Sequence, residues 1–171
     1  MSEHMRLNLG CGDKILPGYV NVDLVDERAG KKPDYQCDIR NLTFKDDVAD
    51  EVLTVHVIEH FYYWEALEVM TEWVRVLKPG GRMVCETPNL VEACMELLKD
   101  PKANAGPKGQ RTMWVFYGDP KWEDPLMCHK WLYTPWSLAD LMRDAGLKNV
   151  HMEPAQYKLR EPRDMRVVGT K

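Results

Sequence analysis

Two short apolar runs separated by a glycine-rich turn constrain the fold of this chain most strongly. Residues 6–9 read RLNL and stop at Gly10, and residues 19–22 read YVNV and stop at Asp23. Each run is too short for a helix, so both are predicted to be buried strands. Gly10 and Gly12 permit a close approach of a ligand that side chains would block. The pattern is typical of a doubly wound α/β sheet, in which ligands bind beyond the carboxyl ends of parallel strands.

The link between these two strands is unusually short. Only residues 13–18 separate Gly12 from the second run. A parallel pair normally needs a crossover of a dozen or more residues, so one helical turn is the most that is expected here. Ile15 stands where a dinucleotide fingerprint has its third glycine. The loss of this phosphate clamp favours a nucleoside cofactor without phosphates, whose ribose hydroxyls Asp23 would bind.

The remaining elements follow from hydrophobic periodicity. Strands are expected at residues 35–38, 51–57, 82–87, 149–152 and 166–170, and helices at 64–77, 90–98 and from Thr134 to just before Gly146. A Lys-Pro-Gly-Gly sequence at 78–81 is expected to break the chain between helix and strand. The irregular, aromatic-rich residues 99–133 are expected to form a lid or an acceptor-binding insertion. We expect residues 1–171 to form one domain.

Composition excludes several classes of protein. The chain has 171 residues with 23 basic and 27 acidic side chains, so its net charge of −4 does not favour nucleic acid or an anionic membrane as a partner. Its five cysteines form no C-x-x-C pair, which indicates free thiols in a reducing compartment. We therefore expect a cytoplasmic monomer or homodimer that holds no metal and crosses no membrane.

The ordered motifs resemble the class I S-adenosylmethionine-dependent methyltransferases, and most closely the small type 11-like branch. The residues that carry this resemblance are 7–12 (LNLGCG), 21–23 (NVD), 37–39 (CDI), 56–61 (HVIEHF), 77–81 (LKPGG), 134–138 (TPWSL) and 140–147 (DLMRDAGL). The resemblance implies a Rossmann-like, mostly parallel sheet of seven strands with the last strand antiparallel and the first crossover shortened.

The resemblance also implies a cofactor site, with S-adenosylmethionine as the cofactor and S-adenosylhomocysteine as the product. The implied binding residues are Gly10, Cys11, Gly12, Asp23, Leu24, Asp38, Ile39, His56 and Val57. The glycine turn would contact the methionine part and Asp23 the ribose. Asp38 and Ile39 would flank the adenine, and His56 and Val57 would lie beside the sulfonium.

The expected activity is methyl transfer to a small-molecule acceptor such as a sugar, a nucleotide or another metabolite. His60 and His129 are the candidate catalytic residues, with His56 and Glu59 behind them, because imidazole exchanges protons near neutral pH. The Asn/Asp-Pro-Pro-aromatic signature of methyltransferases that act on bases or glutamine is absent after the fourth strand. This absence disfavours a nucleic acid as the substrate.

Two other functions fit the sequence. The chain could bind S-adenosylmethionine without catalysis. Residues 56–60 also match the H-x-x-E-H motif of inverted zinc metallopeptidases, with His56 and His60 as metal ligands. That motif requires both histidines on one face of a helix, whereas the preceding β-like run predicts that residue 56 is still extended.

Overall fold

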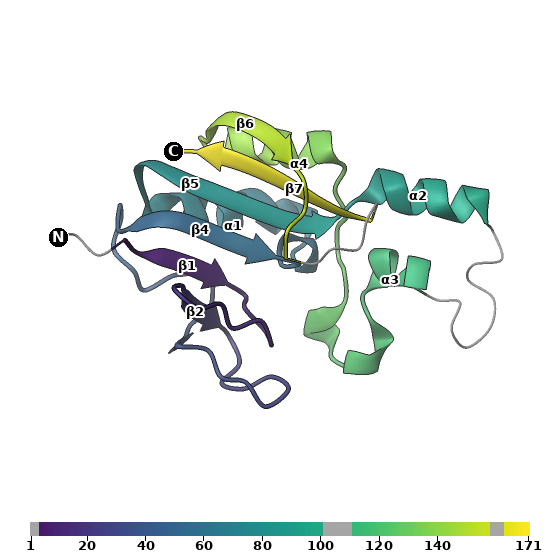
Figure 1. Ribbon diagram of the computed structural model, residues 1–171, viewed down its shortest axis with the longest axis horizontal. Coiled ribbons are helices and arrows are strands. Elements are labelled where there is room, and N and C mark those ends of the chain that lie inside the picture. Colours follow the sequence, from purple (N-terminus) through teal and green to yellow (C-terminus); the bar gives the residue numbers. More distant parts are fainter. Residues whose placement is uncertain (1–3, 101–110, 158–162) are drawn as a thin grey trace.

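A seven-stranded sheet in the order β3-β2-β1-β4-β5-β7-β6 forms the centre of the protein (Figure 1). The structure is a computed structural model that describes residues 4–100, 111–157 and 163–171. Strand β7 runs antiparallel to both of its neighbours, and all other strand pairs are parallel. This topology confirms the predicted fold class. The strands are β1 (Arg6–Leu9), β2 (Val20–Asp23), β3 (Tyr35–Gln36), β4 (Ala49–Val55), β5 (Leu77–Pro88), β6 (Lys148–Glu153) and β7 (Asp164–Thr170).

Helices α1 (Tyr63–Val76) and α4 (Pro135–Asp144) pack against one face of the sheet (Figure 1). Their apolar side chains form the main core with alternate strand residues such as Val52. The intervening residue Leu53 points to the opposite face, as the two-residue period of a strand requires. A smaller cluster on that face is covered by partly buried side chains of loops, namely Leu16, Tyr19 and Tyr157.

The first crossover is shortened, as predicted. Residues 10–19, all of them described, contain a turn but no helix. Two buried asparagines hold the crossover in place where a longer one would have a packed helix. The Asn8 amide donates to the Asn21 side chain at 2.9 Å and to the Lys14 carbonyl at 2.8 Å. The Asn21 side chain in turn accepts from the backbone N–H of Leu16 at 2.8 Å. These contacts fix the turn directly over the ends of β1 and β2.

Several local predictions differ from the structure. Strand β4 ends at Val55, and His56 has a left-handed φ of 56°, so the expectation that residue 56 is extended was wrong. Strand β5 begins at Leu77, which was predicted to be helical, and runs through residues 78–81, which were expected to break the chain. Part of the stretch predicted to be irregular is ordered as α3 (Arg111–Tyr117) and two short 3-10 turns, Pro120–Trp122 and Pro125–Met127. Residues 101–110 of that stretch lie outside the described residues.

The predicted insertion lies at one end of the sheet. Helix α2 (Leu90–Lys99) and α3 extend beyond the carboxyl ends of β4 and β5 (Figure 1). Because β7 is antiparallel, its first residue, Asp164, lies at this same edge, where Pro88 of β5 is its partner in the sheet. The edge of the sheet that binds ligands in α/β proteins therefore receives residues from every part of the chain.

Candidate active site

All of the predicted cofactor residues line one cavity of about 310 Å³ at the carboxyl ends of β1, β2, β3 and β4. They are Gly10, Cys11, Gly12, Asp23, Leu24, Asp38, Ile39, His56 and Val57. The residues come from four separate stretches of sequence, and parallel strand ends bring them together. The cavity also receives Arg40, Trp122 and the candidate base His60.

Gly10 is the position where the cavity wall tolerates no side chain. It has a positive φ of 66°, and a Cβ atom there would lie only 2.7 Å from the Cγ2 atom of Val57. Gly12 also has a positive φ, of 53°, in the same turn. Glycine is thus needed at position 10 both for its backbone conformation and for space.

Asp23 fixes the glycine turn and still faces the cavity. Its carboxylate accepts the backbone N–H of Gly12 at 2.7 Å and that of Val25 at 3.2 Å. A carboxylate has about four lone-pair sites, so these two bonds leave capacity for further donors. The arrangement suits vicinal hydroxyl groups of a ligand.

Asp38 also lines the cavity and is paired with Arg40. Its carboxylate is 2.7 Å from the Arg40 guanidinium, and this hydrogen bond holds the pKa of Asp38 below its ordinary value. The neighbouring Ile39 is buried, and its carbonyl accepts the indole N–H of Trp73 at 2.9 Å. An apolar side chain next to an acceptor carboxylate can hold a flat, hydrogen-bonding ring.

Cys11 is expected to resist alkylation although it lines the cavity. Burial, with the charge of Asp23 adding to it, raises the pKa of the Cys11 thiol to about 12, and only the thiolate reacts. Iodoacetamide at pH 7.5 should therefore modify the exposed Cys128 while peptides that contain Cys11 stay unmodified in mass spectrometry. Equal rates of modification at the two cysteines would contradict this account.

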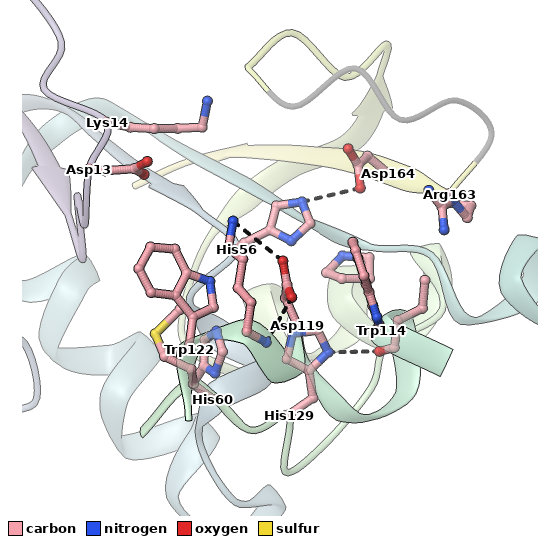
Figure 2. A pocket seen from close by; sticks show the side chains of 14 residues that line it. Asp13, Lys14, His56, His60, Trp114, Asp119, Trp122, His129, Arg163 and Asp164 are labelled. Carbon is pink, nitrogen blue, oxygen red and sulfur yellow. Dashed lines mark hydrogen bonds and ion pairs between the residues drawn. The ribbon is translucent and has the colours of Figure 1, made fainter. Parts of the chain in front are cut away.

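A second cavity of about 280 Å³ adjoins the first (Figure 2). Its lining includes Trp114, Asp119, Lys121 and His129 from the predicted insertion. Residues that line both cavities are Asp13, Lys14, His56, His60, Trp122 and Met127. The shared wall means that a group bound in one cavity lies next to a group bound in the other.

A buried row of ionisable groups lies behind this shared wall. His56 Nε2 lies 3.1 Å from Asp164 Oδ1, and His56 Nδ1 lies 3.2 Å from Glu59 Oε1 (Figure 2 shows the pair with Asp164). Burial alone would raise the pKa of Glu59, but the contact with His56 holds that pKa below its ordinary value.

The two candidate catalytic histidines lie together. The rings of His60 and His129 contact edge to face, with centroids 5.0 Å apart. Burial lowers the pKa of His60 below its ordinary value, although the charge of Glu59 opposes this effect. His60 is therefore neutral at pH 7 and can accept a proton. It lines both cavities, whereas His129 lines only the second.

Some site residues were missed by the sequence reasoning. Asp164 has no local signal, and only the antiparallel direction of β7 brings it to the ligand-binding edge. Lys14 was hidden in the short crossover, yet it lines both cavities. Glu59 was named only as a secondary base. Its central position depends on its contact with His129, which lies in the insertion.

The helix that an inverted zinc-peptidase motif requires does not form in this described segment. Residues Ile58–His60 make a single 3-10 turn, and His56 precedes it with a left-handed backbone. His56 faces Asp164 and Glu59 instead of sharing a helix face with His60. The peptidase interpretation of the motif therefore loses its structural basis.

The sequence and the fold have known relatives. Residues 7–85 match the family described as "Methyltransferase domain". A ubiquinone biosynthesis O-methyltransferase of Cereibacter sphaeroides is 31% identical over 165 residues, which cover 84% of this chain and 60% of that protein. The chain thus spans about three fifths of the length of this relative.

Solved structures share the fold at low sequence identity. A methyltransferase from Archaeoglobus fulgidus superposes with a TM-score of 0.65 at 17% identity, over 99% of this chain and 87% of that one. The magnesium protoporphyrin IX methyltransferase of Synechocystis, solved with bound S-adenosylhomocysteine, has a TM-score of 0.61 at 12% identity, over 98% of this chain and 74% of that one. This likeness concerns the fold alone.

The sheet topology and the cavity at its carboxyl edge define a class I methyltransferase fold. Over residues 7–85 the chain is similar to the methyltransferase domain family, and its fold is that of S-adenosylmethionine-dependent methyltransferases. This confirms the resemblance found in the sequence. None of the helices in the described ranges combines the length and apolar character needed to span a membrane.

Proposed function

We propose that this protein transfers a methyl group from S-adenosylmethionine to a small-molecule acceptor. The observation that carries the proposal is the pair of adjoining cavities with a shared wall that includes His56 and His60. Methyl transfer needs a donor and an acceptor held in contact, because alignment of the two reactants supplies much of the rate. Two cavities that meet at a wall with a neutral histidine meet this need.

The first cavity has the chemistry that S-adenosylmethionine requires. Asp23 accepts from ribose hydroxyls, and Ile39 with Asp38 holds the adenine. The bare backbone at Gly10 lets the methionine part approach the chain. The cofactor supplies a methyl group activated by a sulfonium. The protein residues bind and orient it, exclude water and, at His60, accept the acceptor proton where one must be lost.

The second cavity fits an acceptor with a flat ring or sugar and a polar group. Trp114 and Trp122 offer surfaces for stacking, and Lys121 lies over the Trp122 ring at 4.7 Å. We expect the insertion at 99–133 to act as the lid of this cavity. The name of the Cereibacter sphaeroides relative, an O-methyltransferase, supports an oxygen atom as the acceptor. The proposed partner is this small molecule, with no nucleic acid, and the protein acts as a monomer or homodimer.

Calorimetry with S-adenosylmethionine and S-adenosylhomocysteine tests the cofactor. Binding of both with one site per chain is expected, and failure of both to bind would end the proposal. A tritium-methyl transfer screen against sugars, nucleotides and small phenols then separates an enzyme from a non-catalytic binding protein. Label in at least one product is expected. A chain that binds the cofactor but labels none of these acceptors would favour the binding function.

Replacing Asp23 by alanine is expected to weaken S-adenosylmethionine binding by about 10–100-fold. The reason is the loss of hydrogen bonds to a charged group, each of which contributes roughly 1.5–3 kcal/mol. The dissociation constant from calorimetry measures the effect. Asp26→Ala is the matched control, because Asp26 is exposed and outside the cavity lining. Equal affinities of the two folded variants would contradict the role of Asp23.

A further inference from the structure

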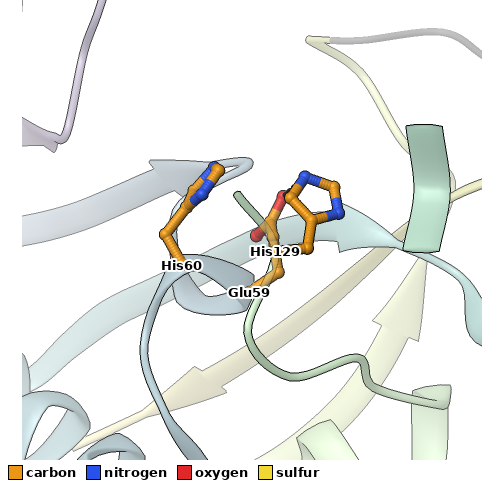
Figure 3. Close-up of side chains that lie close together, drawn as sticks. All are labelled: Glu59, His60 and His129. Atoms are coloured by element: carbon orange, nitrogen blue, oxygen red, sulfur yellow. Dashed lines mark ion pairs between the residues drawn. The ribbon is translucent and has the colours of Figure 1, made fainter. Parts of the chain in front are cut away.

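We propose that Glu59, His60 and His129 form a binding site for one divalent transition-metal ion at the wall of the second cavity (Figure 3). One nitrogen of each histidine ring and one carboxylate oxygen of Glu59 all lie within 4.8 Å of one another, as a group of described residues. Two histidines and a carboxylate are ligands that such ions prefer. The role of the ion in binding an acceptor rests on the proposed function, but the site itself does not.

Both histidines are oriented as metal ligands usually are. His129 Nδ1 lies 2.7 Å from the Val115 carbonyl, and His60 Nδ1 lies 3.2 Å from the Cys128 carbonyl. A carbonyl oxygen only accepts, so Nδ1 carries the proton in each ring. A ring that carries its proton on Nδ1 alone has its lone pair on Nε2. Backbone carbonyls that fix the tautomer in this way are a regular feature of histidine ligands.

Glu59 brings a negative charge to the same place. Its side chain is fully buried, and Oε2 accepts the Thr87 hydroxyl at 2.7 Å. Oε1 makes no well-formed hydrogen bond with any described residue, and it lies 3.2 Å from His56 Nδ1 and 3.9 Å from His129 Nε2. A buried carboxylate oxygen and two imidazole nitrogens this close together form a set of donor atoms that a divalent transition-metal ion can bind.

The surrounding residues support the site. Asp164 holds His56 from the far side at 3.1 Å, and His56 in turn orients the Glu59 carboxylate. Lys130, which follows His129 in the sequence, donates a hydrogen bond from its Nζ atom to the His60 carbonyl at 2.8 Å. A tetrahedral zinc site has its ligand atoms about 3.3 Å apart, so ligand atoms that lie within 4.8 Å of one another must close by up to about 1.5 Å on binding. The partly exposed His60 ring has the freedom to do so.

Three protein ligands leave a coordination position open. In zinc enzymes such a position takes water or an oxygen of the substrate. Here His60 and His129 line the second cavity, so we expect the open position to accept a hydroxyl oxygen of the methyl acceptor. The sequence predicts no metal, because His129 joins the pair Glu59–His60 only through the fold. In this state the two histidines hold the ion and do not act as bases.

In the test, the chelator-treated full chain is titrated with Zn²⁺ alone, and calorimetry measures the binding. One equivalent should bind with a micromolar or lower dissociation constant, and His129→Ala should weaken binding by more than about 100-fold, since even partners of ligands contribute 10–100-fold. His60→Gln is a second ligand variant at a partly exposed position. His151→Ala is the matched control, because that histidine is exposed and lies on β6.

The outcomes are distinct. Loss of zinc binding in both ligand variants but not in His151→Ala supports the site. No binding by the wild-type chain, or equal binding by all variants, overturns it. Calorimetry of the same variants with S-adenosylmethionine shows whether they are folded and tests the proposed function separately. Zinc binding without cofactor binding would refute the proposed function alone, and cofactor binding without zinc binding would refute the metal site alone.

Discussion

The Trp73→Ala variant is expected to lose about 3–5 kcal/mol of its free energy of unfolding, the range measured for removal of large aromatic side chains from cores. Trp73 is completely buried in α1 between the sheet and the Phe61 ring, whose centroid lies 6.1 Å away. Its replacement leaves a large cavity. It also removes the donor to the Ile39 carbonyl, which leaves a polar group unpaired.

Urea denaturation followed by tryptophan fluorescence or circular dichroism measures this loss. Trp64→Ala is the matched control, because Trp64 is on the same helix but is 75% exposed. It stacks on Tyr62 at 4.6 Å, so its removal should cost about 1 kcal/mol or less. Similar losses in the two variants would show that α1 does not pack as described. Trp73→Phe keeps an aromatic ring but removes the donor to the Ile39 carbonyl. Because Ile39 lines the first cavity, this variant should also weaken cofactor binding.

The lining of the first cavity could be predicted from sequence because its residues follow strand ends. Gly10 and Asp23 each end a short apolar run, Asp38 follows the short strand β3, and the ends of parallel strands meet at one edge. The number of strands was likewise available from the resemblance, as was the antiparallel last strand. Whether these residues bind S-adenosylmethionine remains a prediction for the calorimetry.

The acceptor side could be predicted only in part. The stretch that precedes His56 is rich in β-branched residues and favours an extended chain, and nothing local indicates the left-handed φ of 56° that turns the histidine toward Asp164. Glu59 and His129 meet through the tertiary fold, across the ordered part of the insertion. Such contacts depend on how the loop closes over the sheet, which periodicity does not encode.

Replacing His60 by glutamine is expected to lower kcat by about 100-fold or more, the lower end of the contribution of a general acid or base. His60 lies where the two cavities meet, and burial keeps its pKa below the ordinary value, so the wild-type ring is neutral at pH 7. Glutamine has a similar length but does not accept a proton at this pH. The affinity for S-adenosylmethionine should change by less than about threefold, because binding rests mainly on the turn and on Asp23. The exposed His151, changed to glutamine, serves as the control for both measurements.

Steady-state methyl transfer to an acceptor found in the screen gives kcat, and calorimetry gives the cofactor affinity. A kcat within a few-fold of the wild-type value would remove His60 from catalysis. A loss of kcat with unchanged cofactor affinity leaves two explanations, a base or a metal ligand, and treatment of the wild-type enzyme with a chelator distinguishes them. If His60 is a ligand, the chelated wild type should fall to the level of the variant and recover with Zn²⁺, whereas a base is insensitive to the chelator. The same residue thereby decides whether the acceptor is activated by an imidazole or by a metal ion.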